Sequence, residues 1–179
     1  MEGFLDYKKN PREYVYAKVY ESLIEGRLAL EMLKRGLLQN ASSKAFMSVK
    51  SAISAIVVEN FDKILEGKNE KERFWYENVG YSAPTTGLIG ISRDLKKLNI
   101  DVEFVVRIAL SLHRFSYNGF DPNFVDYRES KEVEEDIKEA IKWLLSMDLY
   151  IKFDEKLEKE KEEIRKLLLE LEGDREGTK

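Results

Sequence analysis

Cysteine is absent from the 179 residues of this chain, and histidine occurs once, at position 113. Without thiols the chain has no disulfide, no Cys-ligated zinc, no iron–sulfur cluster and no thiol nucleophile. A single histidine also excludes a His-rich metal site, and no Glu stands three residues before it, because position 110 is leucine. We therefore expect neither a metal nor a cofactor.

Long apolar runs are also missing. No uninterrupted run approaches the roughly 20 residues that span a bilayer, and the first ten residues, MEGFLDYKKN, lack the apolar centre of a signal peptide. Together with the absence of cysteine, this predicts a cytoplasmic protein that does not contact a membrane. Glutamine occurs once while Lys and Glu dominate the charged residues, a bias typical of thermophilic proteins.

An excess of positive charge is lacking as well. The chain has 30 Lys and Arg against 34 Asp and Glu, a formal net charge of −4. Short basic pairs are flanked by acids, a pattern typical of a mixed solvated surface rather than a phosphate-binding track. RNA or a nucleotide remains a possible partner, but the net charge does not support one.

What the chain does have is helical periodicity. Its length suits one domain, and apolar residues recur at steps of three and four with no trustworthy strand pattern or repeat. We predict an all-α protein: an up-and-down bundle of four to five helices with an extra charged C-terminal helix. The predicted parts are an arm at 1–10, the bundle domain at 11–150, the charged helix at 151–172 and a disordered tail at 173–179. Helices are expected near 12–38, 41–65, 88–98, 101–117, 131–147 and 153–172.

The first two helices should form an antiparallel hairpin. Asn10 before Pro11 is a typical N-cap. Gly26 falls within the apolar stripe of the first helix, where it costs about 1 kcal/mol relative to Ala, so a close crossing helix is expected there. Asn60 falls on the apolar face of the second helix and should be a buried polar group that needs partners.

The segment 66–87 is the least regular. Asn69 and Glu72 resemble a capping box that starts a short helix with the aromatic run Phe74–Trp75–Tyr76. Such a run could stack on bases. Since no basic groove accompanies it, we favour a role in covering the end of the bundle.

The helix at 101–117 contains His113. A polar stripe of Glu103, Arg107, Ser111, Arg114 and Asn118 leaves His113 on the opposite side, among Val102, Val106, Ala109, Leu110 and Tyr117. This predicts a histidine that points at the core. If its helix neighbours that of Asn60, the two polar side chains could hydrogen-bond or line a small ligand pocket. The candidate ligand-binding residues are Asn60, His113, Tyr117 and Arg114.

Arg107 and His113 are also the candidate catalytic residues. An imidazole that moves a proton and a guanidinium that holds phosphate charge can together cleave RNA. Six residues, however, place them about 120° apart around the helix and about 9 Å apart along it, and Glu103 is placed to pair with Arg107. The geometry favours a surface Glu–Arg pair and a core histidine, unless a second protomer or a helix bend joins the groups.

Two stretches together resemble a known family: the hairpin EMLKRGLLQNASSKAFMSVKSAISAI and the segment LHRFSYNGF. They are similar to the archaeal PaREP-type family, helical proteins related to the HEPN class. The resemblance covers roughly residues 12–145. It implies a HEPN-like bundle, commonly dimeric, and HEPN relatives often act as ribonucleases through Arg-x(4–6)-His or as toxins paired with a nucleotidyltransferase. Arg107 to His113 has that spacing, but Ile108 replaces the usual polar residue after the arginine.

From these observations we expect a HEPN-like protein that acts without catalysis, by self-association as a dimer or by binding a protein or nucleotide-type ligand. A partner protein such as a nucleotidyltransferase is compatible with this expectation. The alternative is a metal-independent, toxin-like ribonuclease with a composite site at a dimer interface.

Overall fold

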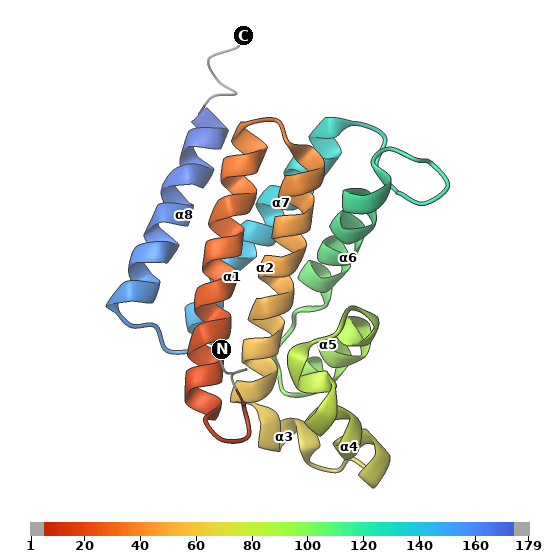
Figure 1. The fold of residues 1–179 in the computed structure, drawn as a ribbon, viewed down its shortest axis with the longest axis vertical. Coiled ribbons are helices and arrows are strands. Elements are labelled where there is room, and N and C mark those ends of the chain that lie inside the picture. Colours follow the sequence, from red (N-terminus) through yellow and green to blue (C-terminus); the bar gives the residue numbers. More distant parts are fainter. Residues whose placement is uncertain (1–5, 174–179) are drawn as a thin grey trace.

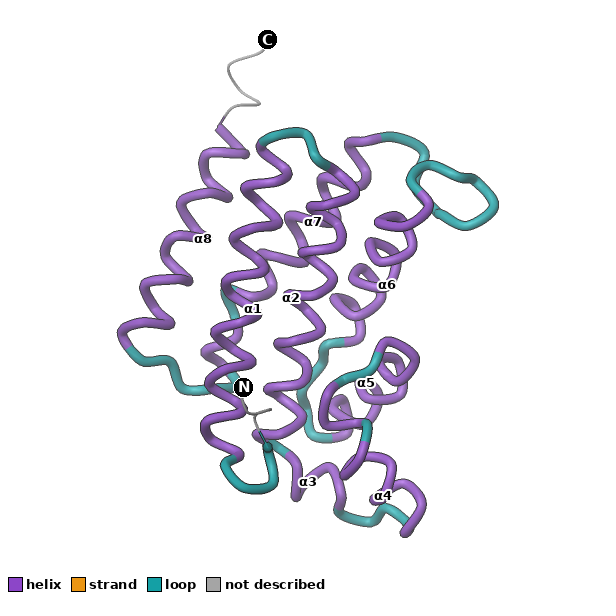
Figure 2. Tube along the Cα trace, in the orientation of Figure 1, coloured by secondary structure: helices purple, strands orange, loops and turns teal. Residues whose placement is uncertain are grey.

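The computed structural model describes residues 6–173, and every regular element in that range is a helix (Figures 1 and 2). Successive long helices of the bundle run in opposite directions, with α8 along the outer side of α1 and three short helices closing one end. The elements are α1 (Pro11–Lys34), α2 (Leu38–Glu59), α3 (Phe61–Leu65), α4 (Glu70–Asn78), α5 (Leu88–Lys97), α6 (Glu103–Asn118), α7 (Ser130–Leu144) and α8 (Glu155–Gly173). The predicted all-α bundle with an extra C-terminal helix is confirmed.

The hairpin of α1 and α2 begins at the N-cap that the sequence predicts, but its turn comes earlier than predicted, because α1 ends at Lys34 and α2 begins at Leu38. The Asn10 side chain accepts a hydrogen bond from the backbone N–H of Glu13, and Pro11 is the first helical residue. At the other end Gly36 adopts a φ of 74°, and the N–H of Leu37 bonds to the carbonyl of Met32 at 3.0 Å. This left-handed cap satisfies the last carbonyls of α1 and reverses the chain.

Helix α2 is the centre of the bundle, since it contacts α1, α6 and α7. Small side chains on several sides of α2 allow these helices to approach closely. The fully or nearly fully buried small residues are Ala41, Ser42, Ala45, Ser48, Ser51, Ala52, Ser54 and Ala55.

The apolar character of α2 has a consequence for the membrane prediction. Among the described helices, α2 alone is long and apolar enough, as an average over 18 residues, to cross a membrane. However, 78% of that window is buried inside the bundle, as in the core helix of a soluble protein. Polar residues such as Lys50 interrupt α2, so it contains no uninterrupted apolar run of that length.

The helix predicted at 41–65 is interrupted, which corrects that prediction. Asn60 separates α2 from the short α3, and its side-chain amide donates to the Ile56 carbonyl at 2.9 Å. An asparagine that bonds its own preceding turn competes with the helical ladder and favours an end at this point. Asn60 is therefore half-buried at the end of α2, not buried within an apolar face.

Helix α8 covers α1 within the same chain. Its apolar stripe of Leu157, Ile164 and Leu168 is buried, and Arg27 of α1 pairs with Glu160 at 2.9 Å. The apolar stripe of α8 is thus buried within the chain. Residues 1–5 of the predicted arm and 174–179 of the predicted disordered tail lie outside the described residues, and the domain limits stay a prediction.

The expected close crossing at Gly26 leads to a stability test. A Cβ at this position would lie 2.6 Å from Leu144 Cδ1 and 3.1 Å from Ser48 Oγ, and both of those residues are fully buried. Overpacking costs about 1–3 kcal/mol, whereas alanine gains about 1 kcal/mol of helix propensity. We predict that Gly26→Ala lowers the free energy of unfolding in urea, by about 1 kcal/mol.

Gly90→Ala is the matched control, because a Cβ at Gly90 in α5 would have no atom within 4 Å. This variant should keep or raise stability, by up to about 1 kcal/mol. If Gly26→Ala proved as stable as Gly90→Ala, the close helix crossing would be refuted.

Candidate functional site

His113 lies at the edge of the core instead of inside it. Its ring is half-buried and stacks on buried Phe46 of α2, with centroids 4.1 Å apart. Tyr117 covers its edge at 5.2 Å, but Tyr117 itself is 78% exposed. The prediction that both residues face the core is therefore wrong. The buried stripe of α6 is Val105, Val106, Ile108, Ala109, Leu112 and Phe115.

The local environment opposes protonation of His113. Burial, followed by the positive charges of Lys50 and Arg114, lowers the pKa of His113 below its ordinary value. The imidazole is thus neutral at pH 7. It could accept a proton, but nothing described beside it would hold it in its charged form.

Arg107 lies on another face of α6, as the helical geometry predicts. Its guanidinium bonds to Glu103 Oε1 at 2.7 Å on the exposed side of the helix, which confirms the predicted Glu–Arg pair. Six residues of helix separate Arg107 from His113, and within one chain the two lie on different faces. A catalytic role for either residue stays a prediction.

The other two candidate ligand-binding residues are also separated from a common site. Arg114 pairs with Asp126 of the following loop at 2.8 Å. Asn60 lies fourteen residues beyond Phe46 on α2, which is about 21 Å along a helix. The contact considered between Asn60 and His113 therefore does not form, because Asn60 lies at the end of α2 while His113 stacks on Phe46 in its first half. Asn60 instead lines a separate cleft of about 730 Å³ with Tyr7 and Arg12.

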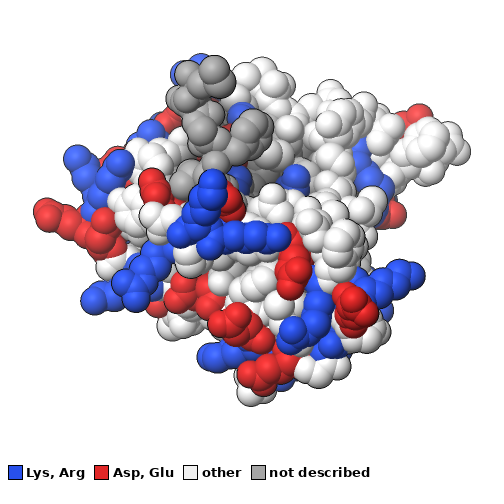
Figure 3. Space-filling view, turned by 60° about the horizontal axis from the view of Figure 1, so that its bottom comes forward, with Lys and Arg blue, Asp and Glu red and all other residues white. Residues whose placement is uncertain are grey.

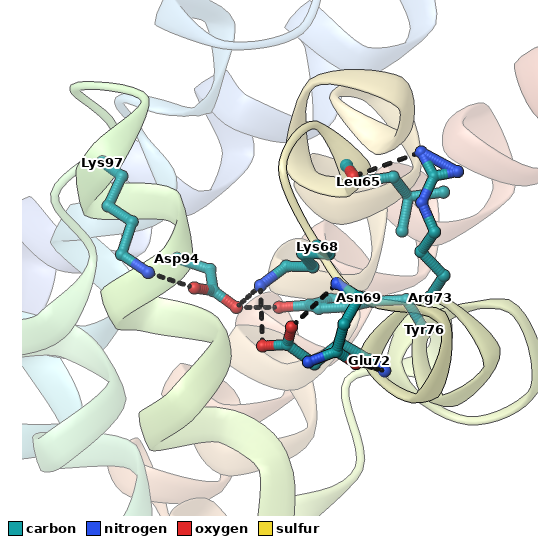
Figure 4. Close-up of polar contacts among 8 residues, drawn as sticks. All are labelled: Leu65, Lys68, Asn69, Glu72, Arg73, Tyr76, Asp94 and Lys97. Atoms are coloured by element: carbon teal, nitrogen blue, oxygen red, sulfur yellow. Dashed lines mark hydrogen bonds and ion pairs between the residues drawn. The ribbon is translucent and has the colours of Figure 1, made fainter.

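A polar cluster that the sequence did not predict joins the loop before α4 to α4 and α5 (Figure 4). Asp94 accepts bonds from Lys68 at 2.7 Å, Tyr76 at 2.9 Å and Lys97 at 2.9 Å. Glu72 lies 3.8 Å from the Lys68 ammonium. Residues 68 and 94 are 26 positions apart, so only the fold brings them together. The capping box of Asn69 and Glu72, which the sequence did predict, is confirmed.

The cluster favours the ordinary charge states of its members. Burial alone would raise the pKa of Asp94, but the bonds from Lys68, Lys97 and Tyr76 outweigh it and hold that pKa below its usual value. Burial, with the neighbouring Asp94 carboxylate, raises the pKa of the Tyr76 hydroxyl. Asp94 therefore stays ionised and Tyr76 stays protonated at neutral pH. This is typical of a structural ion-pair network, and neither group is poised to act as a general acid or base.

Two clefts open on either side of this cluster. One of about 530 Å³ lies between α4 and α5 and includes Trp75 and Gly90; the other, of about 300 Å³, includes Lys63 and Lys97. Positive and negative side chains intermingle on the face that contains α3 and α4 (Figure 3). This pattern agrees with the predicted mixed surface. Among residues 6–173, no three potential metal ligands gather closely enough to hold an ion.

The aromatic run of α4 divides between two environments. Tyr76 is buried and Trp75 half-buried, and both pack against the rest of the protein. Phe74 is 66% exposed. The rings of Trp75 and Tyr76 therefore help to cover the end of the bundle, whereas the ring of Phe74 faces solvent.

The pKa of His113 predicts how stability depends on pH. Because folding lowers this pKa, the unfolded state binds the proton more tightly, so the contribution of His113 to stability is full above the unfolded value of about 6.5 and declines as pH falls below it. His113→Phe preserves the stack on Phe46 and removes the titration. Between pH 7.5 and pH 5.5, chemical unfolding should show a smaller loss of stability in His113→Phe than in the unsubstituted protein. Equal losses would mean that the imidazole is as well solvated folded as unfolded.

Comparison with known proteins adds one finding to this geometry. Residues 17–141 match the model of the archaeal PaREP1/PaREP8 family, a range that includes most of α1, all of α2 to α6 and most of α7. No curated protein and no solved structure matches the chain. Since the matched range exceeds half of the sequence, the chain belongs to the archaeal PaREP1/PaREP8 family.

Proposed function

We propose that this protein acts without catalysis, by self-association in the cytoplasm, through an apolar surface at the end of the bundle where α1 turns into α2. The observation behind the proposal is the exposure of large apolar side chains there. Tyr117 is 78% exposed, Phe124 60% and Phe120 43%. All three lie on the last turn of α6 or in the loop that follows it, and exposed aromatic side chains are typical of protein interfaces. We call Leu37, His113, Tyr117, Phe120 and Phe124 the aromatic surface.

Contacts within the chain bring the α1–α2 turn, the end of α6 and Phe120 together. Gln39, two residues after Leu37, donates to the Ser116 carbonyl at 3.3 Å, so the α1–α2 turn lies beside the end of α6. Phe120 packs edge-on against buried Phe115, with centroids 4.9 Å apart. These contacts anchor the base of the surface, and an anchored surface loses little conformational entropy on binding.

The charges nearby favour a protein over a nucleic acid as the partner. Arg107 and Arg114 already have carboxylate partners in Glu103 and Asp126. A phosphate backbone would have to displace those carboxylates, and the net charge of −4 adds repulsion. Arginines and aromatics side by side are, in contrast, enriched at protein interfaces.

A second copy of the chain is the partner that this surface suits best. A patch of one charge sign repels its own copy, whereas an apolar patch with internally neutralised arginines does not. The HEPN-like character suggested by the sequence supports the same choice, since such bundles are commonly dimeric. A different protein, for example a nucleotidyltransferase, is the competing occupant.

The oligomeric state tests this proposal. We predict that light scattering during gel filtration gives the mass of a dimer for the unsubstituted chain at micromolar concentration. The double variant Tyr117→Ser/Phe124→Ser should elute as a monomer with an unchanged melting temperature, because both side chains are exposed and contribute little to the monomer fold.

Phe74→Ser is the matched control, since Phe74 is equally exposed but lies on α4 at the other end of the protein. It should remain dimeric. A monomeric unsubstituted chain at 100 µM, about the limit of a useful weak association, would contradict self-association and leave the surface to a different protein.

The ribonuclease alternative has one observation in its favour. Arg107 and His113 each lie three residues from Leu110, which is half-buried on the outer part of α6. If two copies of α6 crossed antiparallel at Leu110, Arg107 of one chain would face His113 of the other, which is the composite site that a single chain lacks.

RNA cleavage separates the two functions. Under the non-catalytic proposal, RNA incubated with the protein and a chelator stays intact, and His113→Ala mainly lowers stability, by about 1 kcal/mol, through loss of the Phe46 stack. Under the alternative, RNA is cut, and Arg107→Ala abolishes cleavage at an almost unchanged melting temperature, because its exposed ion pair contributes little. Cleavage with that response would overturn the non-catalytic proposal.

A further inference from the structure

The cleft between α4 and α5 contains a glycine that the fold itself does not require. Among the described glycines, Gly36, Gly67 and Gly119 adopt positive φ, and Gly26, Gly80 and Gly87 would clash with neighbours if they had a Cβ. Gly173 is the last described residue. Neither a positive φ nor a close neighbour requires glycine at position 90. Gly90 lies within α5, and a Cβ there would meet only open space. Glycine in a helix reduces stability relative to alanine, so its presence suggests that something approaches the backbone from outside.

The walls beside Gly90 are apolar and fixed in place. Ile91 lies beneath the cleft and is fully buried, so it supports the floor without being exposed. The six-membered ring of the Trp75 indole lies against both Gly80 and Gly87, so closely that a Cβ at either glycine would overlap it. The absence of side chains at these two glycines therefore allows the half-buried Trp75 ring to pack closely against the backbone. The cleft of about 530 Å³ is in the size range of small-molecule sites.

The cleft has both charge signs at one end. Lys68 and Asp94 form their ion pair at its inner part, and Lys71 and Glu72 lie at its rim. Lys71 makes no ion pair with any residue of the described range, and the Glu72 side chain is 50% exposed. A ligand with one charge would be attracted by half of these groups and repelled by the other half. A zwitterion can match both signs at once.

We propose that this cleft binds a free amino acid with a large apolar or aromatic side chain. The side chain lies over Gly90 against Trp75, the carboxylate faces Lys71, and the ammonium faces the half-exposed carboxylate of Glu72. This site is independent of the aromatic surface, which lies at the other end of the bundle (Figure 1). It assigns a ligand-binding role to the α4–α5 region of the chain.

Titration with L-phenylalanine, followed by the indole N–H signals in NMR spectra, tests the proposal. The chain has two tryptophans, so Trp143 on α7 is an internal control. The Trp75 signal should shift saturably with a millimolar or lower dissociation constant while that of Trp143 stays in place. 3-Phenylpropionate and 2-phenylethylamine, which each lack one charge, should bind at least about tenfold more weakly.

Two variants complete the test. Gly90→Leu extends a side chain from a position where a Cβ meets only open space into the cleft, so it should lower L-phenylalanine affinity at least about tenfold while the protein still unfolds in one cooperative transition. Lys71→Ala should weaken L-phenylalanine but leave 2-phenylethylamine unaffected. Any one of three results would overturn the proposal: no saturable shift at about 10 mM, unchanged affinity in Gly90→Leu, or equal affinity for the singly charged analogues.

Discussion

The close approach of three helices to α2 is the constraint on which the rest of the structure depends. Large side chains on several faces of α2 would push α1, α6 and α7 apart. Small residues prevent this, and the serines among them need internal partners. Ser48 donates to the Ser22 carbonyl of α1 at 2.8 Å, and Ser54 lies 2.8 Å from both the Tyr14 hydroxyl and the Tyr81 carbonyl. The same helix therefore anchors α1 and the segment that leads to α5.

This arrangement explains why the two proposed surfaces lie at opposite ends of the bundle (Figure 1). At one end α6 packs on α2 with only one face, so that Tyr117 and the loop after α6 are left exposed. At the other end Asn60 stops α2, and the chain forms α3 to α5 as a separate layer. The Lys68–Asp94 cluster ties that layer together and leaves a cleft beside it. Neither surface needs a catalytic group, which agrees with the neutral, half-buried His113.

Local signals in the sequence were sufficient for the existence of the helices but not for every end, since α1 stops at Lys34 and α2 at Glu59, before the predicted positions 38 and 65. Asn10, Gly36 and the Asn69–Glu72 box act within a few residues, and the structure confirms the predicted N-cap and capping box. The direction in which α6 faces the core was harder to predict, because apolar residues occupy most of its circumference. The polar stripe placed His113 and Tyr117 inward, although the buried residues directly opposite that stripe are Val105 and Leu112. The Lys68–Asp94 cluster could not be predicted from the sequence, because its members are distant in the chain and meet only after folding.

Self-association through the end of α6 is the central claim, and hydrogen exchange measured at two protein concentrations tests it most directly. The amides of residues 116–127 should exchange more slowly at high concentration than at low concentration, with α4 as an unaffected reference, because only an interface between copies becomes protected by mass action. Protection that does not change with concentration, or that changes only outside this segment, would contradict the account.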